Sequence, residues 1–191
     1  MKLKVSLFFV IMLISLIISR SYLSLCALLA AALHELGHIA VAKLRSIPLS
    51  ELRLGIFGAS LTTDIPFCSY KDEIFLASAG PLANIASFLL AFTIRSFLGE
   101  LGEFFLVSSL FLAILNLLPI DDLDGGRILK CVLLYNTSPK VSYTVCKALS
   151  FSTVFCLWVL SVYLLLRLAA SLSLFIFSLA LFCKIFWGKN I

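Results

Sequence analysis

Charged residues are scarce in this 191-residue sequence: Asp, Glu, Lys and Arg make up 13% of it, whereas hydrophobic residues make up 62%. A soluble domain has about a quarter charged and about half apolar residues. No segment is polar enough and long enough to fold as a separate soluble domain. The composition therefore predicts an all-α polytopic membrane protein, with residues 1–191 forming one integral-membrane domain.

Two further absences exclude classes of function. The six cysteines form no Cys-x-x-Cys pair and mostly lie in apolar stretches. We interpret them as small buried hydrophobic residues rather than as a disulfide framework. The net charge is +5, but there is no basic tract and no interleaving of basic and aromatic residues. Nucleic acid is therefore not an expected partner. The expected surroundings of the protein are the lipid bilayer.

Long apolar runs predict about six transmembrane helices. A spanning helix needs about 20 residues, so the chain has room for about six spans and little else. The first run follows a short basic N-terminus, as in a signal peptide, but no small-x-small cleavage site comes after it, and we expect it to be retained. The stretch 128–135 is apolar but too short to cross. The six predicted spans cover about residues 5–19, 22–42, 74–95, 104–118, 148–166 and 170–186.

Basic residues are distributed unevenly between the two sides that these spans define. If the N-terminus is inside, 12 of the 15 Lys and Arg fall on the inner side and 3 on the outer side. An excess of Lys and Arg marks cytoplasmic loops. The sequence therefore predicts a multi-pass protein of the cell membrane with both termini in the cytoplasm.

The loop between the second and third predicted spans, residues 44–72, has no helical pattern. Its apolar runs with glycines at the bends favour one or two short strands, so a short β-hairpin is expected here. Such a hairpin could offer an edge strand to an extended peptide. A surface loop without any role in substrate binding is the alternative, and the sequence leaves both open.

The only two histidines stand four residues apart, in His34-Glu35-Leu36-Gly37-His38, within the second predicted span. On a helix, the H-E-x-x-H spacing puts both imidazoles on one face, where they can bind a single zinc ion. Glu35 is then placed to take a proton from water at the metal. Ionisable side chains inside a membrane segment are costly and mark functional sites. Gly37 is expected to leave room beside the metal.

A third zinc ligand must be a carboxylate or a cysteine, because a catalytic zinc site has three protein ligands and no third histidine exists. Two acids fall on the outer side of the membrane and are excluded. The fourth predicted span runs in the same direction as the second, so its end reaches the depth of the histidines. Pro119 and the pair Gly125-Gly126 allow a turn there. The candidate acids are Asp64, Asp72 and Glu73 in or next to the loop, and Asp121, Asp122 and Asp124 after the fourth span.

Three motifs, in this order along the chain, resemble those of the site-2 protease family of intramembrane zinc metalloproteases (peptidase family M50). His34–His38 resembles the zinc-binding motif. Ala79-Gly80-Pro81-Leu82-Ala83-Asn84 resembles the family's Gly-Pro-x-x-Asn element. Asn116-x-x-Pro119, leading to Leu123-Asp124-Gly125-Gly126, resembles the Asn-Pro-Asp-Gly region. The motifs place the catalytic core at about residues 22–130.

The chain also departs from the family pattern. Leu117 stands where a proline often follows the motif asparagine, and Asp121 and Asp122 stand where many relatives have proline or apolar residues. Residues 44–72 are too few for the PDZ domain that many relatives insert. The compact layout, with the metal-binding histidines in the second span, is most similar to the stage IV sporulation protein FB group.

The resemblance implies an enzyme, a zinc metalloendopeptidase with one Zn²⁺ per chain bound by His34, His38 and Asp124. Glu35 is implied as the general base. Asn84 and Asn116 are the polar groups expected to hold the substrate backbone or to line the water path. An interhelical hydrogen bond is the alternative for both, and for Asn84 it is at least as well favoured. The implied substrate is a membrane-associated protein cut near the cytoplasmic face, such as a sigma-factor precursor or an anti-sigma factor. A regulatory membrane protein is a further implied partner.

A different class of function is a zinc-binding membrane protein without protease activity, or a metal permease. Such a protein would not need a glutamate between its two histidine ligands. Glu35 therefore favours the enzyme.

Overall fold

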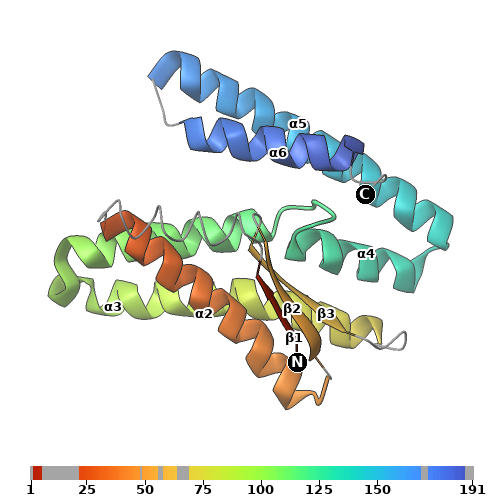
Figure 1. Ribbon diagram of the computed structural model, residues 1–191, viewed down its shortest axis with the longest axis horizontal. Helices are drawn as coiled ribbons and strands as arrows, with labels where there is room; N and C mark the ends of the chain where they lie inside the picture. The colour runs from red at the N-terminus through yellow and green to blue at the C-terminus, as the bar shows by residue number, and fades with distance from the viewer. Residues whose placement is uncertain are drawn as a thin grey trace. The chain divides into compact units, whose positions relative to one another are not determined.

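A computed structural model describes residues 2–5, 22–47, 49–55, 58–63, 69–168 and 172–187 (Figure 1). The chain folds as two compact units, Met1–Leu117 and Leu118–Ile191. The predicted first span lies outside the described residues except for its first residue, as do Asp64 and Cys68. The other five cysteines are free thiols.

The first unit contains two long apolar helices, α2 (Tyr22–Leu44) and α3 (Tyr70–Asn116). Ser69 caps α3 by accepting a hydrogen bond from the backbone N–H of Lys71 at 3.4 Å. Helix α3 breaks at Gly99, where φ is +58° and ψ is −140°. Only glycine adopts this conformation readily, and the chain doubles back at this point (Figure 1). Helix α3 thus contains both the third and the fourth predicted spans, on either side of one break.

Small residues let α2 and α3 approach closely. A Cβ atom at Gly37 would lie 2.6 Å from the carbonyl oxygen of Ala79 and 2.8 Å from the Cβ of Ala83. Without such an atom, the two backbones can pack together, as small residues allow in membrane helices. The expectation that Gly37 leaves room for a metal is therefore wrong: this glycine contacts the backbone of α3.

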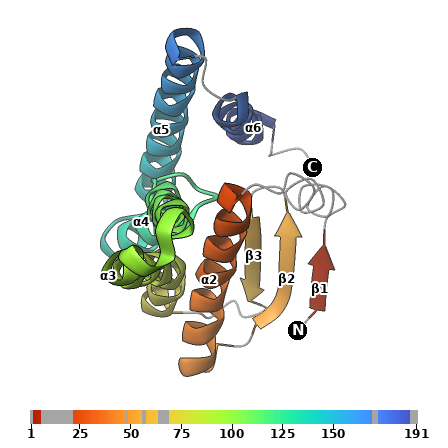
Figure 2. The same ribbon diagram turned by 90° about the vertical axis from the view of Figure 1, so that its left-hand side faces the viewer.

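Three short strands complete the first unit: β1 (Lys2–Val5), β2 (Leu49–Gly55) and β3 (Gly58–Thr63). Figure 2 shows them side by side, with β2 in the middle. Strands β2 and β3 pair antiparallel, from Gly55 opposite Gly58, and β1 pairs parallel to β2. Strands β2 and β3 occupy the segment for which the sequence predicts a hairpin. The parallel partner β1 comes from the N-terminus and has no signal in the sequence.

The second unit consists of α4 (Asp124–Asn136), α5 (Pro139–Leu168) and α6 (Leu172–Trp187). Helix α4 has 13 residues and a length of about 20 Å, so it is shorter than the hydrocarbon core of a bilayer. Helices α5 and α6 share a buried polar contact, because the hydroxyl groups of Ser161 and Ser178 lie 3.1 Å apart. Polar side chains inside a helical membrane protein commonly pair in this way.

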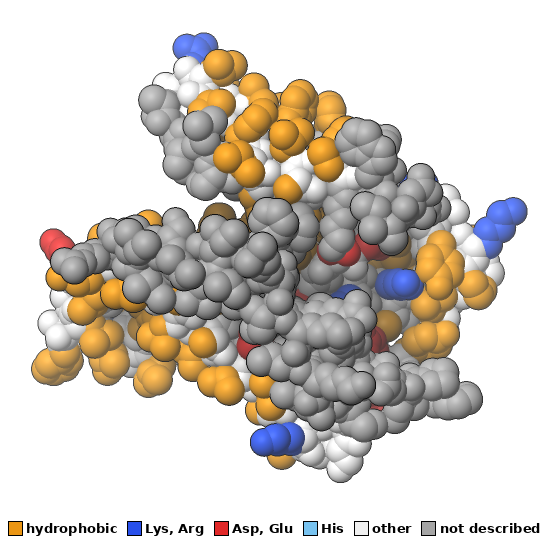
Figure 3. All heavy atoms as spheres, viewed as in Figure 1, with side chains coloured by type: hydrophobic (Ala, Val, Ile, Leu, Met, Phe, Trp, Pro, Cys, Tyr) orange, Lys and Arg blue, Asp and Glu red, His pale blue; other side chains and the backbone are white. Residues whose placement is uncertain are grey.

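Three of the described helices are long and apolar enough to cross a membrane: α2, α3 and residues Pro139–Arg167 of α5. Hydrophobic side chains lie on the surface of these helices instead of facing only a core (Figure 3). Phe97 is 89% exposed and Leu166 is 78% exposed. Such surfaces are expected where lipid replaces water as the solvent. The number of six spans stays a prediction.

Candidate metal centre

His34 and His38 project from the same face of α2, one turn apart, and both are buried. Their Nε2 atoms lie 3.1 Å apart, with the two rings at 79° to each other. Two ligands of one tetrahedral zinc ion, each about 2.05 Å from the metal, are separated by about 3.3 Å. The two nitrogen atoms therefore already have the spacing that a shared zinc ion requires.

The other ring nitrogen of each histidine is bound to α3. Nδ1 of His38 lies 2.7 Å from the carbonyl oxygen of Leu76, which can only accept a hydrogen bond. Nδ1 must therefore carry the proton, so the neutral His38 ring has its lone pair on Nε2. Nδ1 of His34 lies 3.2 Å from Nδ2 of Asn84. Zinc-binding histidines generally have such a partner on the nitrogen that does not bind the metal.

Gly80 lies between these two contacts on α3, because Leu76, Gly80 and Asn84 follow one another at intervals of four residues. A Cβ atom at Gly80 would overlap Nε2 of His38 and would lie 2.5 Å from Nε2 of His34. The absent side chain leaves the space beside both Nε2 atoms open. The donor set and this space fit a metal ion, and Gly80 has the role that the sequence suggested for Gly37.

Glu35 follows His34 directly and is therefore about 100° further around α2. Its side chain is half-buried, and its carboxylate oxygen Oε2 is fully buried. A buried carboxylate that follows a buried imidazole in the same helical turn is a candidate for proton transfer at a group that the imidazoles hold.

Asp124 begins α4 in the second unit, and its carboxylate is buried. The turn before it is held by Ser150 of α5, whose hydroxyl group accepts a hydrogen bond from the backbone N–H of Asp121 at 3.0 Å. The same hydroxyl donates to the carbonyl oxygen of Pro119 at 3.3 Å. Gly126 packs against the carbonyl oxygen of Ile120, where a Cβ atom would overlap it. Ser150 has no signal in the sequence that would reveal this role.

The neighbouring acids differ from Asp124 in their exposure. Asp121 and Asp122 are exposed, although they are only two or three residues away. Asp72, in the first turn of α3, forms an ion pair with Arg45 at 2.6 Å on the surface. Of the acids that the sequence left open as ligands, Asp124 is the buried one among the described residues.

Asn84 and Asn116 differ in their surroundings. Asn84 is fully buried and meets His34 across 50 residues of sequence. Asn116 is half-buried at the end of α3, and its side chain donates to the carbonyl oxygen of Leu112 in its own helix at 3.0 Å. The structure thus brings Asn84 to the histidines, whereas the described contact of Asn116 is local.

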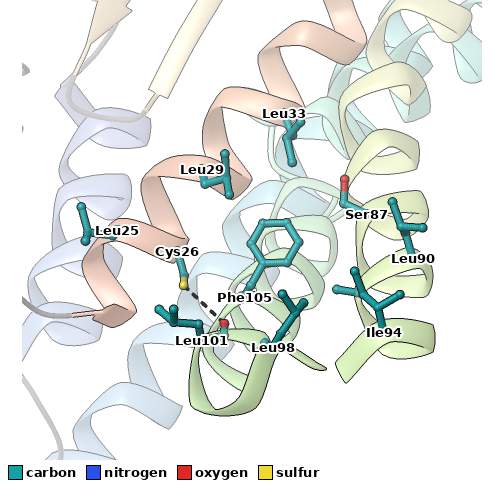
Figure 4. Close-up of a pocket in the computed structure, with 12 residues that line it drawn as sticks. Leu25, Cys26, Leu29, Leu33, Ser87, Leu90, Ile94, Leu98, Leu101 and Phe105 are labelled. Carbon is teal, nitrogen blue, oxygen red and sulfur yellow. Dashed lines mark hydrogen bonds between the residues drawn. The ribbon is translucent and has the colours of Figure 1, made fainter. Parts of the chain in front are cut away.

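A separate apolar pocket of about 480 Å³ lies between α2 and the two segments of α3 that precede and follow the break at Gly99 (Figure 4). Leucine side chains from all three helical segments point into it. Ser87 is its hydroxyl-bearing residue, and that hydroxyl is bound to the carbonyl oxygen of Ala83 in the same helix. Cys26 also lines the pocket, and its thiol donates to the carbonyl oxygen of Leu101 at 3.6 Å, so the pocket offers mainly hydrophobic contact.

Comparison with known proteins adds family evidence to this geometry. The sequence profile of peptidase family M50 matches residues 93–160, which include Asn116 and Asp124 but not the histidine motif. The chain is 37% identical over 115 residues to stage IV sporulation protein FB of Bacillus subtilis, a match that covers 55% of this chain and 38% of that protein. It is 30% identical over 132 residues to a zinc metalloprotease of Methanocaldococcus jannaschii, covering 63% of this chain and 38% of that protein. The chain thus spans well under half the length of these relatives.

A solved structure shares the fold. The site-2 protease from Methanocaldococcus jannaschii aligns with a TM-score of 0.70 over 99% of this chain and 91% of that chain, at 22% sequence identity. A likeness at this identity concerns the arrangement of the backbone alone.

Proposed function

We propose that the chain belongs to the site-2 protease family, peptidase family M50, and is an intramembrane zinc metalloprotease. The profile match to residues 93–160, the identity to stage IV sporulation protein FB and the helices long enough to span a membrane support the proposal. The observation that carries it is the pair of buried Nε2 atoms 3.1 Å apart on α2, with Glu35 next to His34 in the sequence. The proposed family implies zinc, and the buried nitrogens and the open space at Gly80 fit it.

The proposed ligands of the single zinc ion are His34, His38 and Asp124, all three of which are buried. When bound, zinc would polarise the scissile carbonyl and make water acidic enough to attack near neutral pH. Leu76 fixes the proton of His38 on Nδ1 and so keeps Nε2 available as a ligand. Asp124 adds a negative charge, which favours a divalent cation.

Glu35 is proposed as the general base. Its carboxylate would accept a proton from the attacking water and deliver it to the amine that leaves the peptide. The two histidines are buried, and burial strengthens charge interactions there. Asn116 is proposed to line the path of substrate or water, on the basis of its place in the motif rather than of any described contact.

The proposed substrate is a membrane-associated protein, because the chemistry lies among helices that are suited to a bilayer. A sigma-factor precursor or an anti-sigma factor is the finer proposal, and it rests on the resemblance to the stage IV sporulation protein FB group. A zinc-binding membrane protein without protease activity is the second candidate. Such a protein would bind zinc but would leave a reporter substrate uncut.

Removal of zinc should abolish cleavage reversibly. We expect the purified chain in lipid vesicles to contain one zinc ion and to cut a membrane-tethered reporter protein. Phenanthroline should stop cleavage, and added Zn²⁺ should restore it, because bound zinc would activate the water that attacks the peptide bond. Elemental analysis and gel assays measure the two quantities. Zinc binding without any cleavage would favour the second candidate, and cleavage that survives complete removal of zinc would contradict the proposal.

The orientation of the chain gives a second expected result. Both termini and the histidine end of α2 are proposed to face the cytoplasm, because 12 of 15 basic residues fall on that side. On a cysteine-free background, Lys140→Cys should react with an impermeant thiol reagent only from the cytoplasm, and Glu100→Cys only from outside. Both native side chains are exposed. Labelling of position 140 from outside would reverse the orientation.

A further inference from the structure

The contacts of the two histidines form a continuous chain of hydrogen bonds that joins α3 to α2 and back. Asn84 Nδ2 lies 3.2 Å from His34 Nδ1, the two Nε2 atoms lie 3.1 Å apart, and His38 Nδ1 lies 2.7 Å from the carbonyl oxygen of Leu76. A neutral imidazole has one N–H and one lone pair, so the position of the proton on one ring nitrogen fixes the hydrogen-bonding role of the other.

At one end of this series of hydrogen bonds, the carbonyl oxygen of Leu76 accepts from His38 Nδ1–H, which leaves the lone pair of His38 on Nε2. At the other end, the side-chain amide of Asn84 lies 3.2 Å from His34 Nδ1. Which amide atom faces Nδ1 depends on the tautomer of His34, because Nδ1 either donates or accepts there.

Zinc binding requires one particular tautomer of His34. A metal-binding Nε2 must offer its lone pair to the metal, so the proton must lie on Nδ1 and have an acceptor there. The carbonyl oxygen of Asn84 is the one acceptor that a half-turn of the amide brings to the same place. This oxygen, Oδ1, is buried and has no hydrogen-bond partner among the described residues, so no described hydrogen bond to Oδ1 holds the amide in its present orientation.

We infer that Asn84 is a positioning residue for the metal centre: it presents Oδ1 to His34 Nδ1–H and so keeps the lone pair of His34 Nε2 available to zinc. Asparagine is suited to this role because its side chain carries a carbonyl acceptor. The carbonyl oxygen of Leu76 acts in the same way on His38. This inference rests on the proposed zinc site.

Two substitutions distinguish a role of residue 84 as hydrogen-bond acceptor from a role in packing alone. Asn84→Leu keeps the branched shape of the side chain and removes both polar atoms, whereas Asn84→Asp keeps an acceptor at the same place. We expect Asn84→Leu to weaken zinc binding by about 10–100-fold, the usual effect of removing a partner of a metal ligand. Asn84→Asp should retain the affinity of the unaltered protein or exceed it. Ser87→Ala is the matched control, because Ser87 lies one turn further along α3 and is bonded within its own helix.

Zinc affinity is measured by competition with a chelator in the detergent-solubilised chain, without any activity assay. A second readout is ¹⁵N NMR of protein labelled only at histidine, which is simple to interpret because the chain has two histidines. In the zinc-loaded protein, His34 should carry its proton on Nδ1. Unchanged affinity in Asn84→Leu, equal loss in Asn84→Asp, or a deprotonated Nδ1 in zinc-loaded His34 would each overturn the inference. If the unaltered chain binds no zinc, the proposed function fails as well, which distinguishes the two cases. Should Asn84→Leu fail to fold, the NMR measurement on the unaltered protein still decides.

Discussion

Glu35→Gln is expected to abolish cleavage of a membrane-tethered reporter while leaving zinc bound. The substitution keeps the size and shape of the side chain but removes its ability to accept a proton. Because Glu35 is not a proposed ligand, the His34–His38 pair should still hold the metal. The rate of cleavage should fall by about 10²–10⁴-fold, the usual contribution of a general base. Reporter cleavage and zinc content should be measured on the same preparation.

Glu100→Gln is the matched control for this experiment. Glu100 is exposed next to the break at Gly99, so the same chemical change there removes a charge without touching the candidate site. Its cleavage rate should remain that of the unaltered protein. A Glu35→Gln protein that cleaves at the unaltered rate would exclude Glu35 as the base, and one that loses its zinc would assign Glu35 a role in binding the metal.

The sequence predicted the parts of the site that depend on local geometry. His34 and His38 are one helical turn apart, so their common face follows from the period of an α-helix as soon as residues 22–42 are recognised as helical. The predicted bounds of this helix, residues 22–42, nearly match those of α2, Tyr22–Leu44. A long apolar run in a sequence with few charges favours a membrane-spanning helix over other structures. The general fold of a helical membrane protein is confirmed for the described residues.

Contacts between distant segments could not be predicted in the same way. The partner of His38 is the backbone carbonyl of Leu76, a group that every residue has and that no sequence pattern can reveal. The opposite roles of Gly37 and Gly80 depend on which side of α2 faces α3, and their sequence positions do not show this. Gly99 lies in the predicted connection between the third and fourth spans, residues 96–103. The sequence does not show that the chain reverses at this one residue while the residues on either side of it stay helical.

Loss of zinc is the second large effect that we expect, and it tests the ligand assignment directly. His34→Ala, His38→Ala and Asp124→Ala should each lower zinc affinity by more than about 100-fold, since removing only a hydrogen-bond partner of a ligand costs about 10–100-fold. Cleavage should disappear with the metal. Chelator competition measures the affinity, and size-exclusion chromatography in detergent shows whether each variant is folded.

Asp121→Ala and Asp122→Ala are the matched controls, because they remove the same carboxyl group from exposed positions in the turn before Asp124. Both variants should keep zinc. The backbone N–H of Asp121, which donates to Ser150, remains in the alanine variant, so the turn that precedes α4 should also keep its conformation. If either control loses the metal while Asp124→Ala retains it, the third ligand is the exposed acid, and the burial of Asp124 serves its contact with Arg127 instead.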